Sequence, residues 1–440
     1  MKSNLKSWIP VNKNSDFPIQ NLPFGIFSPP KEVIAKHDKA KDILPRVGVA
    51  IGDYVLDLLE LKKTGVFNSL NFDTNAFAKS TLNDFIFLGK KTTNAVRARI
   101  SKLLEERNPE LRDDEKTRAK VLHKMSEVEM LLPLEIKDYT DFYSSMEHAR
   151  NVGMMFRDPA NALLPNWKHL PVGYHGRSSS IVVSGTNFHR PKGQMLQAAI
   201  VPAAAVGGLP LPPPPATVVF GPSKQLDFEL EMAFVIGKET KLGESVTTKN
   251  AEEYIFGMML FNDWSARDIQ SWEYVPLGPF LGKNFCSSLS PWVVTMDALE
   301  SFRIAGPKQE PEVLPYLQYS GNKNYDINLE VLINDTPVSK SNFKYMYWNI
   351  CQQLAHHTVN GCNIRIGDLM ASGTISGPTP ESFGSMLELT WKGTKPIKMS
   401  DGSARKFMND NDTVIMRGFS EKDGVRIGFG EVKGKVLPAI

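Results

Sequence analysis

The chain reads Leu226-Asp-Phe-Glu-Leu-Glu-Met-Ala-Phe-Val-Ile236 near its middle, where apolar and acidic residues alternate as they do on a β-strand. Side chains two residues apart on a strand share a face, so Glu229 and Glu231 are predicted to lie together. Two desolvated carboxylates repel each other, and the fold must supply a Lys or Arg partner or a metal ion. The spacing leaves open an alternative, a strand pair with one solvated face.

A third carboxylate, Asp263, follows the apolar run Tyr254-Ile-Phe-Gly-Met-Met-Leu-Phe261. An acid between a strand and a helix projects from a rigid edge, which is a common position for a metal ligand. On the helix predicted to follow, Arg267, Gln270 and Tyr274 recur at spacings of three and four, so one face carries a cation, an amide and a phenol. Such a face is usually solvated, but in a cleft it would bind an oxyanion.

The segment Asp141-Phe-Tyr-Ser-Ser-Met-Glu-His-Ala-Arg150 contains a possible capping box, Ser144 with Glu147. It predicts that a helix begins there, with His148 in its first turns and Tyr143 just before it. A lone helical histidine is more often structural than catalytic. The neighbouring acid, phenol and arginines favour a catalytic role. A similar box, Ser265 with Asp268, is predicted to begin the helix after Asp263.

Composition excludes several classes of protein. Lys and Arg are dispersed along 440 residues with a net charge of +3, so nothing favours a nucleic-acid partner or a membrane surface. The N-terminus lacks the apolar core of a signal peptide, and three scattered cysteines cannot form a disulfide framework, which favours a cytoplasmic location. The uncharged tract from Met195 to Phe220 is interrupted by prolines and is interpreted as a peripheral loop, with the Ala/Pro-rich insertion at 195–216.

The predicted organisation is two domains, residues 1–132 and residues 133–440. The first contains the hairpin 46–58, turning at Gly52-Asp53, and helices near 81–88 and 93–106. The second is dominated by strands and has one long helix, 341–360. Its strands are expected at 180–184, 228–236, 255–262, 291–295, 327–333, 385–391, 412–418 and 424–430. Regular strand-helix alternation is missing, so the fold class is β-rich, mixed α+β.

The pair His356-His357 does not form a convincing metal site. Adjacent helical residues point about 100° apart, and no third ligand has suitable spacing, so interaction with the helix dipole is the preferred interpretation. The carboxylates are a better candidate. An all-oxygen ligand set favours calcium or magnesium over zinc.

Several motifs together closely resemble the fumarylacetoacetase family. They are Asp141-Phe-Tyr-Ser-Ser, Asn161-Ala-Leu-Leu-Pro-Asn-Trp167, Pro171-Val-Gly-Tyr-His-Gly-Arg177, Glu229-Leu-Glu231, Asn262-Asp-Trp-Ser-Ala-Arg-Asp-Ile-Gln270, Ala371-Ser-Gly-Thr-Ile-Ser-Gly377 and Gly384-Ser-Met-Leu-Glu388. The similarity covers almost the whole chain. The acidic motif alone would indicate only the wider fumarylacetoacetate hydrolase superfamily, which includes acylpyruvate hydrolases, decarboxylases and isomerases.

The resemblance implies a fold, an assembly and a reaction. It implies a small N-terminal SH3-like β-barrel, a large C-terminal β-roll, and a cytosolic homodimer. The expected reaction is hydrolysis of a carbon–carbon bond of 4-fumarylacetoacetate to fumarate and acetoacetate, the last step of tyrosine and phenylalanine catabolism.

The resemblance also implies a role for each matching residue. Calcium is expected on Asp141, Glu229, Glu231 and Asp263, and magnesium near Asp263, Lys283 and Ser287. His148 is the expected general base, oriented by Glu388. The oxyanion is expected on Arg267, Gln270 and Lys283, and the substrate on Tyr143, Arg157, Tyr174, Gln270, Tyr274 and Thr374.

The chain departs from the family pattern in two places, and two alternatives to the implied function remain. Cys286-Ser287 stands where the family usually has Gly-Thr, and the Ala/Pro tract before Glu229 is longer than expected. One alternative is a relative that acts on a shorter acylpyruvate or on oxaloacetate. The other is a catalytically silent, calcium-stabilised scaffold, whose signature would be loss of the His148–Glu388 pair.

Overall fold

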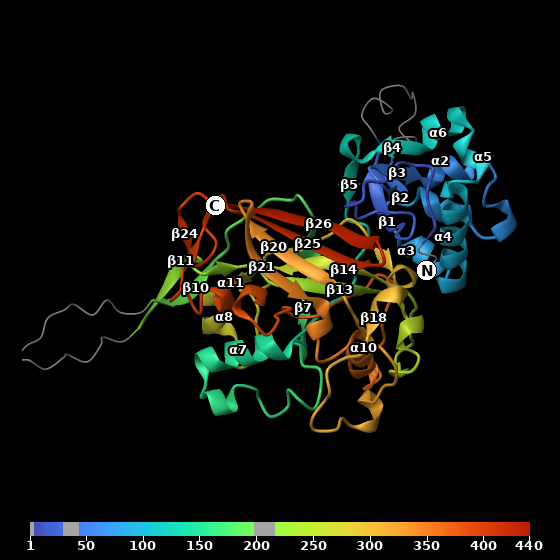
Figure 1. The fold of residues 1–440 in the computed structure, drawn as a ribbon. Coiled ribbons are helices and arrows are strands. Elements are labelled where there is room, and N and C mark those ends of the chain that lie inside the picture. The colour runs from blue at the N-terminus through green and yellow to red at the C-terminus, as the bar shows by residue number, and fades with distance from the viewer. Residues whose placement is uncertain (1–3, 30–43, 198–215) are drawn as a thin grey trace, which may run out of the picture.

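The computed structural model describes residues 4–29, 44–197 and 216–440 (Figure 1). The N-terminal part contains a five-stranded sheet in the order β4-β3-β2-β1-β5. Its strands are β1 (Phe24–Ser28), β2 (Arg46–Ile51), β3 (Tyr54–Asp57), β4 (Leu122–Lys124) and β5 (Glu129–Leu131). The predicted hairpin is confirmed, because β2 pairs with β3 and Gly52 takes the left-handed conformation that the turn requires.

Five helices accompany this sheet, of which α4 is the longest. They are α2 (Leu58–Lys62), α3 (Asn83–Phe87), α4 (Lys90–Leu104), α5 (Pro109–Arg112) and α6 (Glu115–Val121). The helices predicted near 81–88 and 93–106 are therefore confirmed as α3 and α4.

A large sheet forms the centre of the C-terminal part, in the order β7-β6-β22-β13-β14-β16-β8, with β17 also paired to β14. These strands are β6 (Tyr139–Phe142), β7 (Gly173–Gly176), β8 (Ile181–Val183), β13 (Leu230–Ile236), β14 (Ile255–Asp263), β16 (Ser287–Leu289), β17 (Val294–Thr295) and β22 (Leu369–Ala371). Strand β22 is late in the chain but lies between β6 and β13.

A second sheet has the order β21-β20-β25-β26-β9. Its strands are β9 (Phe188–His189), β20 (Asn328–Ile333), β21 (Thr336–Asn342), β25 (Thr413–Lys422) and β26 (Val425–Leu437). In Figure 1 these strands lie across the large sheet, and β25 and β26 contact β14. The two sheets enclose a common apolar core.

Short strand pairs and five helices complete the described chain. The pairs are β10 (Lys192–Gln197) with β11 (Thr217–Pro222), β12 (Leu226–Asp227) with β15 (Ser265–Ala266), β18 (Arg303–Ile304) with β19 (Asn324–Tyr325), and β23 (Ile397–Lys398) with β24 (Ala404–Arg405). The helices are α7 (Met146–Phe156), α8 (Arg267–Glu273), α9 (Met296–Leu299), α10 (Ile350–Thr358) and α11 (Met386–Leu389).

Strand β13 is buried on both faces, so the alternative of a solvated face is wrong. Leu230, Met232 and Phe234 belong to the core between the two C-terminal sheets. Ala233 and Val235, on the face of Glu231, belong to a second core shared with the N-terminal sheet. The face that carries Glu231 is therefore covered by apolar side chains further along the strand, so its carboxylate is shielded from bulk solvent.

Two predicted elements are wrong. The long helix 341–360 is only α10, because Ser341 belongs to β21 and Asn349 caps α10 by accepting hydrogen bonds from the backbone of Cys351 and Gln352. The strand expected at 385–391 is the short helix α11, capped by Ser385. In both places a polar residue satisfied the free N–H groups of a first helical turn.

The two predicted capping boxes are also wrong. Ser145, one residue later than expected, caps α7, whereas the Ser144 hydroxyl accepts a hydrogen bond from Gln353. Helix α8 begins after Ala266 without a side-chain cap, and Asp268 instead bonds the segment after β11. Both helices still begin within two residues of the predicted positions.

The tract from Met195 to Phe220 is described only at its ends, which pair as β10 and β11. Most of the predicted insertion, residues 198–215, lies outside the described residues. Among the helices that the structure describes, none has the length and apolarity needed to cross a membrane.

Candidate active site and metal centre

The large sheet brings polar side chains together at one end of its strands. Across the sheet, the contributing residues are Tyr174 on β7, Asp141 on β6, Glu231 on β13, Asp263 on β14 and Ser287 on β16. Thr374 follows β22, and Glu229 precedes β13. Neighbouring strands thus place residues that are far apart in sequence on one rigid edge.

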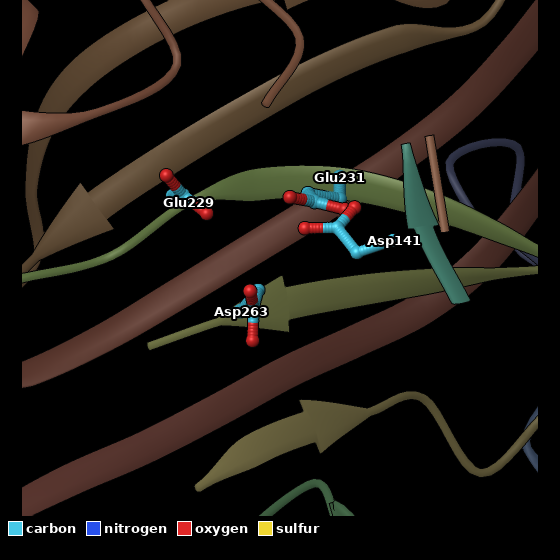
Figure 2. A group of neighbouring side chains, drawn as sticks. All are labelled: Asp141, Glu229, Glu231 and Asp263. Carbon is cyan, nitrogen blue, oxygen red and sulfur yellow. The ribbon is translucent and has the colours of Figure 1, made fainter. Parts of the chain in front are cut away.

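Four of these residues form a buried carboxylate cluster. Asp141, Glu229, Glu231 and Asp263 each offer an oxygen, and these oxygens all lie within 4.8 Å of one another. Figure 2 shows the Asp141 and Glu231 carboxylates close together, with Glu229 and Asp263 beside them. Twice a calcium–oxygen bond is about 4.6–5.2 Å, so one ion could contact all four oxygens.

One side of the cluster, formed by Asp141 and Glu231, has unpartnered carboxylate oxygens. Oδ1 of Asp141 and Oε1 of Glu231 are buried and have no hydrogen-bond partner among the described residues. Burial and the neighbouring carboxylates raise the pKa of both groups well above its usual value. Orphaned carboxylate oxygens in a dry site fit a hard cation, and the residues present therefore fit a metal ion.

Two cations reach one side of the cluster. Lys283 pairs with Glu229 and Asp263, and Arg267 pairs with Glu229 at 2.8 Å. Burial alone would raise the pKa of the Glu229 carboxyl, but the charges of these two side chains hold it below its usual value. The hydroxyl of Ser287 donates to Asp263 at 2.8 Å. The Asp141–Glu231 side of the cluster forms no such ion pair in the described structure.

A histidine–carboxylate pair lies beside the cluster. Nδ1 of His148 is 2.7 Å from Oε2 of Glu388, and both side chains are buried. Glu388 also accepts hydrogen bonds from Asn151, Ser376 and Ser385. Although burial raises its pKa, the charge of His148 and these bonds hold the pKa of Glu388 below its usual value. Glu388 is thus an ionised partner that fixes the imidazole orientation.

The other imidazole nitrogen is free to react. Nε2 of His148 has no hydrogen-bond partner among the described residues, and the ring of Tyr143 lies edge-on with centroids 5.1 Å apart. Burial and the charge of Glu388 raise the pKa of the Tyr143 phenol above its usual value, so this phenol stays protonated. Tyr174 donates its hydroxyl to Asp263 at 3.1 Å.

Three expected residues lie further from this network. Arg157 is exposed and donates to the carbonyl of Ala162 at 2.7 Å. Tyr274 is also exposed, at the end of α8. Gln270 contacts the site through Arg267, at 3.3 Å. Thr374 is buried, and its hydroxyl has no partner within the described part of the chain.

Sequence reasoning missed four residues that support the site. Asp227 holds Arg267, and Asn151, Ser376 and Ser385 surround the Glu388 carboxylate. Asp227 could have been predicted from the sequence, because it stands two residues before Glu229 in the same alternating acidic pattern. The other three are ordinary polar residues whose role depends on tertiary contacts.

The interpretation of His356 and His357 needs correction. Both lie in the last turn of α10, as expected. Burial lowers the pKa of both, and burial with the charge of His175 lowers the pKa of His357 to about 4. A neutral imidazole adds no charge to the helix dipole near pH 7. His357 instead contacts Thr140, at 3.0 Å.

An oriented imidazole beside a carboxylate cluster that could hold a metal ion is typical of a hydrolytic site. Two protein-family models match the chain: Fumarylacetoacetase N-terminal over residues 20–133, and Fumarylacetoacetate (FAA) hydrolase C-terminal over residues 137–437. The chain therefore belongs to the fumarylacetoacetate hydrolase family.

Curated relatives match over nearly the full length. The fumarylacetoacetase of Homo sapiens is 52% identical over 440 residues, covering 99% of both chains. That of Dictyostelium discoideum is 51% identical, again covering 99% of both chains. A solved fumarylacetoacetate hydrolase from Exiguobacterium antarcticum is 17% identical and covers 95% of this chain and 99% of its own, with a TM-score of 0.50. That likeness supports the fold alone.

Proposed function

We propose that this enzyme hydrolyses 4-fumarylacetoacetate to fumarate and acetoacetate. Two observations support the proposal: about half of the residues are identical to fumarylacetoacetases over the whole chain, and His148 contacts Glu388 beside the carboxylate cluster. The same contact argues against a catalytically silent scaffold, which would have no reason to keep an oriented imidazole.

His148 acts as the general base. Its Nε2 takes a proton from the attacking water, while Glu388 holds the Nδ1 proton and stabilises the imidazolium that forms. Such proton transfer contributes roughly 10² to 10⁴ in rate. Burial around the pair excludes competing water, which strengthens its interaction.

Arg267, Gln270 and Lys283 stabilise the oxyanion that forms when water adds to the carbonyl. Arg267 has an unpartnered buried nitrogen, Nη2, available for this purpose within the described structure. The neighbouring carboxylates raise the pKa of Arg267 and of Lys283 against the effect of burial, so both remain charged. Each such donor is worth about 3 to 4 kcal/mol.

Carbon–carbon cleavage is feasible because the leaving carbanion is an enolate. The cluster of Asp141, Glu229, Glu231 and Asp263 would hold Ca²⁺, and a bound hard cation polarises the oxygens of the β-diketone. We place Mg²⁺ near Asp263 and Ser287. A protonated Lys283 has no free lone pair, so it contributes charge there rather than a side-chain ligand.

The remaining residues position the substrate. Tyr143, Tyr174 and Thr374 would bind it through their hydroxyl groups, and the exposed side chains of Arg157 and Tyr274 would bind it from the solvent side. Arg157 would bind a substrate carboxylate after leaving the Ala162 carbonyl.

The same proposal includes the finer features of the fold and assembly. The N-terminal sheet is an SH3-like barrel, the C-terminal sheets are a β-roll, and the enzyme is a cytoplasmic homodimer. Exposed apolar side chains, among them Phe220, Leu277 and Phe280, support the dimer, because a lone subunit would leave them in water.

The decisive experiment follows the absorbance of the conjugated diketone. Purified enzyme should consume 4-fumarylacetoacetate and release equal amounts of fumarate and acetoacetate. Acylpyruvates and oxaloacetate serve as competing substrates. Turnover of a shorter acylpyruvate with a larger kcat/KM than that of fumarylacetoacetate would contradict the proposal.

A further inference from the structure

Asp227 forms hydrogen bonds to two separate parts of the site. Its carboxylate is fully buried. Oδ2 accepts hydrogen bonds from Nε of Arg267 at 2.9 Å and from the backbone of Leu387 at 3.0 Å, and Oδ1 accepts one from the backbone of Met386 at 2.6 Å. Those two amides open α11, the helix that carries Glu388. One carboxylate thus contacts both the cation and the helix of the histidine partner.

The first contact sets the plane of the Arg267 guanidinium. Its Nε binds Asp227 and its Nη1 binds Glu229 at 2.8 Å, which leaves Nη2 as the donor without a partner among the described residues. A planar guanidinium held at two edges presents its third nitrogen in a fixed direction. Without Asp227 the group would be held at one edge only.

The second contact fixes α11. This helix has four residues, so its own hydrogen bonds cannot hold it in place. Asp227 satisfies the free N–H groups of Met386 and Leu387, while Ser385 caps the N–H of Glu388. A shift of α11 would move the carboxylate of Glu388 away from the imidazole.

We propose that Asp227 is a positioning residue. Its single carboxylate aligns both the oxyanion donor Arg267 and the Glu388–His148 pair. The inference rests on the proposed function, because both groups act in that reaction. The hydrogen bonds of Asp227 in the described structure go to Arg267, Met386 and Leu387 and not to the carboxylate cluster, so it acts through the residues it holds.

The test is a pair of double-mutant cycles, one combining Asp227→Asn with Arg267→Lys and the other combining it with Glu388→Gln. Asparagine keeps the shape but replaces a charged acceptor with an amide, and kcat should fall about tenfold to a hundredfold. Loss of Asp227 already misplaces both partners, so each double variant should lose far less than the product of its single losses.

Asp412→Asn is the matched control. Asp412 is also a buried carboxylate, and it binds the guanidinium of Arg405 at 2.8 and 2.9 Å and the backbone N–H of Asn409 at 2.7 Å. It contacts neither Arg267 nor α11 in the described structure. This variant should lower the melting temperature, leave kcat within about twofold, and combine multiplicatively with both site variants.

Three outcomes decide the inference, with the folded fraction of every variant measured by circular dichroism. If the losses of kcat multiply in both double-mutant cycles, the inference is overturned, because a residue with only a structural role lowers kcat independently of Arg267 and Glu388. If Asp227→Asn does not fold, Asp227→Glu replaces it; failure of both while Asp412→Asn folds makes Asp227 structural and overturns the inference. No turnover by the unaltered enzyme would refute the proposed function instead.

Discussion

Nδ1 of His148 lies 2.7 Å from Oε2 of Glu388, across a separation of 240 residues. The two side chains come from α7 and α11, which contact each other, and both are shielded from solvent. The carboxylate has three further donors, so its position is fixed independently of the imidazole. Glu388 therefore acts as a fixed anchor against which the base is oriented.

His148→Ala should lower kcat by about 10² to 10⁴, because it removes the base while leaving the carboxylate cluster intact. Glu388→Ala should act on the same step by freeing the imidazole. The double variant should be no worse than the more damaged single variant, as measured by steady-state kinetics. Losses that multiply would show that the two residues do not form a dyad.

Removal of metal should abolish activity and lower the melting temperature. Without a metal ion, the cluster keeps unpartnered, buried oxygens on Asp141 and Glu231, whose carboxylates repel each other. Calorimetry before and after chelation, with calcium or magnesium added back separately, measures the effect of each ion. Full activity in protein shown metal-free by elemental analysis would contradict the prediction.

Ser287→Thr should be close to neutral and Ser287→Val should be worse. Threonine keeps the hydroxyl that donates to Asp263, whereas valine removes it and retains only the backbone carbonyl. The comparison is made by titrating activity with magnesium. Equal magnesium dependence of both variants would mean that the hydroxyl has no part in the second site.

His357→Gln should reduce the loss of stability at acid pH. The folded-state pKa of His357, about 4, lies below its reference value of 6.5, so the unfolded chain binds the extra proton between these values. Stability contributed by this neutral histidine is present above pH 6.5 and is lost as pH falls toward 4, by up to about 2 kcal/mol at pH 5. Melting temperatures of the two proteins between pH 7 and 5 provide the measurement. If the melting temperatures of the two proteins fall equally between pH 7 and 5, the prediction for His357 is wrong.

Local sequence patterns were sufficient to predict those site residues whose position depends on a single strand. The alternation around Glu229 and Glu231 predicted that both carboxylates lie together, and the structure has Glu231 on β13 and Glu229 directly before it. The apolar run before Asp263 gave the end of β14. The same alternation continues back to Asp227. Helix α11 could not be predicted, because its N–H groups are satisfied by that same distant carboxylate.

Contacts between distant segments account for the other errors. Ser144 resembles a helix cap, but its hydroxyl binds Gln353 on α10, and Ser145 takes the capping position. Met232 to Ile236, beyond Glu231, are all apolar, which is the pattern of a strand buried on both faces. What the sequence could not give is the packing partner of the face that carries Ala233 and Val235, the core shared with the N-terminal sheet.

The position of β22 has a consequence for how the enzyme is made. Asp141 on β6 and Glu231 on β13 are neighbours only because β22, translated after both, lies between their strands. All four carboxylates leave the ribosome before β22 does, so Asp141 can stay apart from the other three, and hydrated, until that strand is made. Insertion of β22 thus brings the fourth charge to the cluster only after Lys283 and Arg267 are available to balance it.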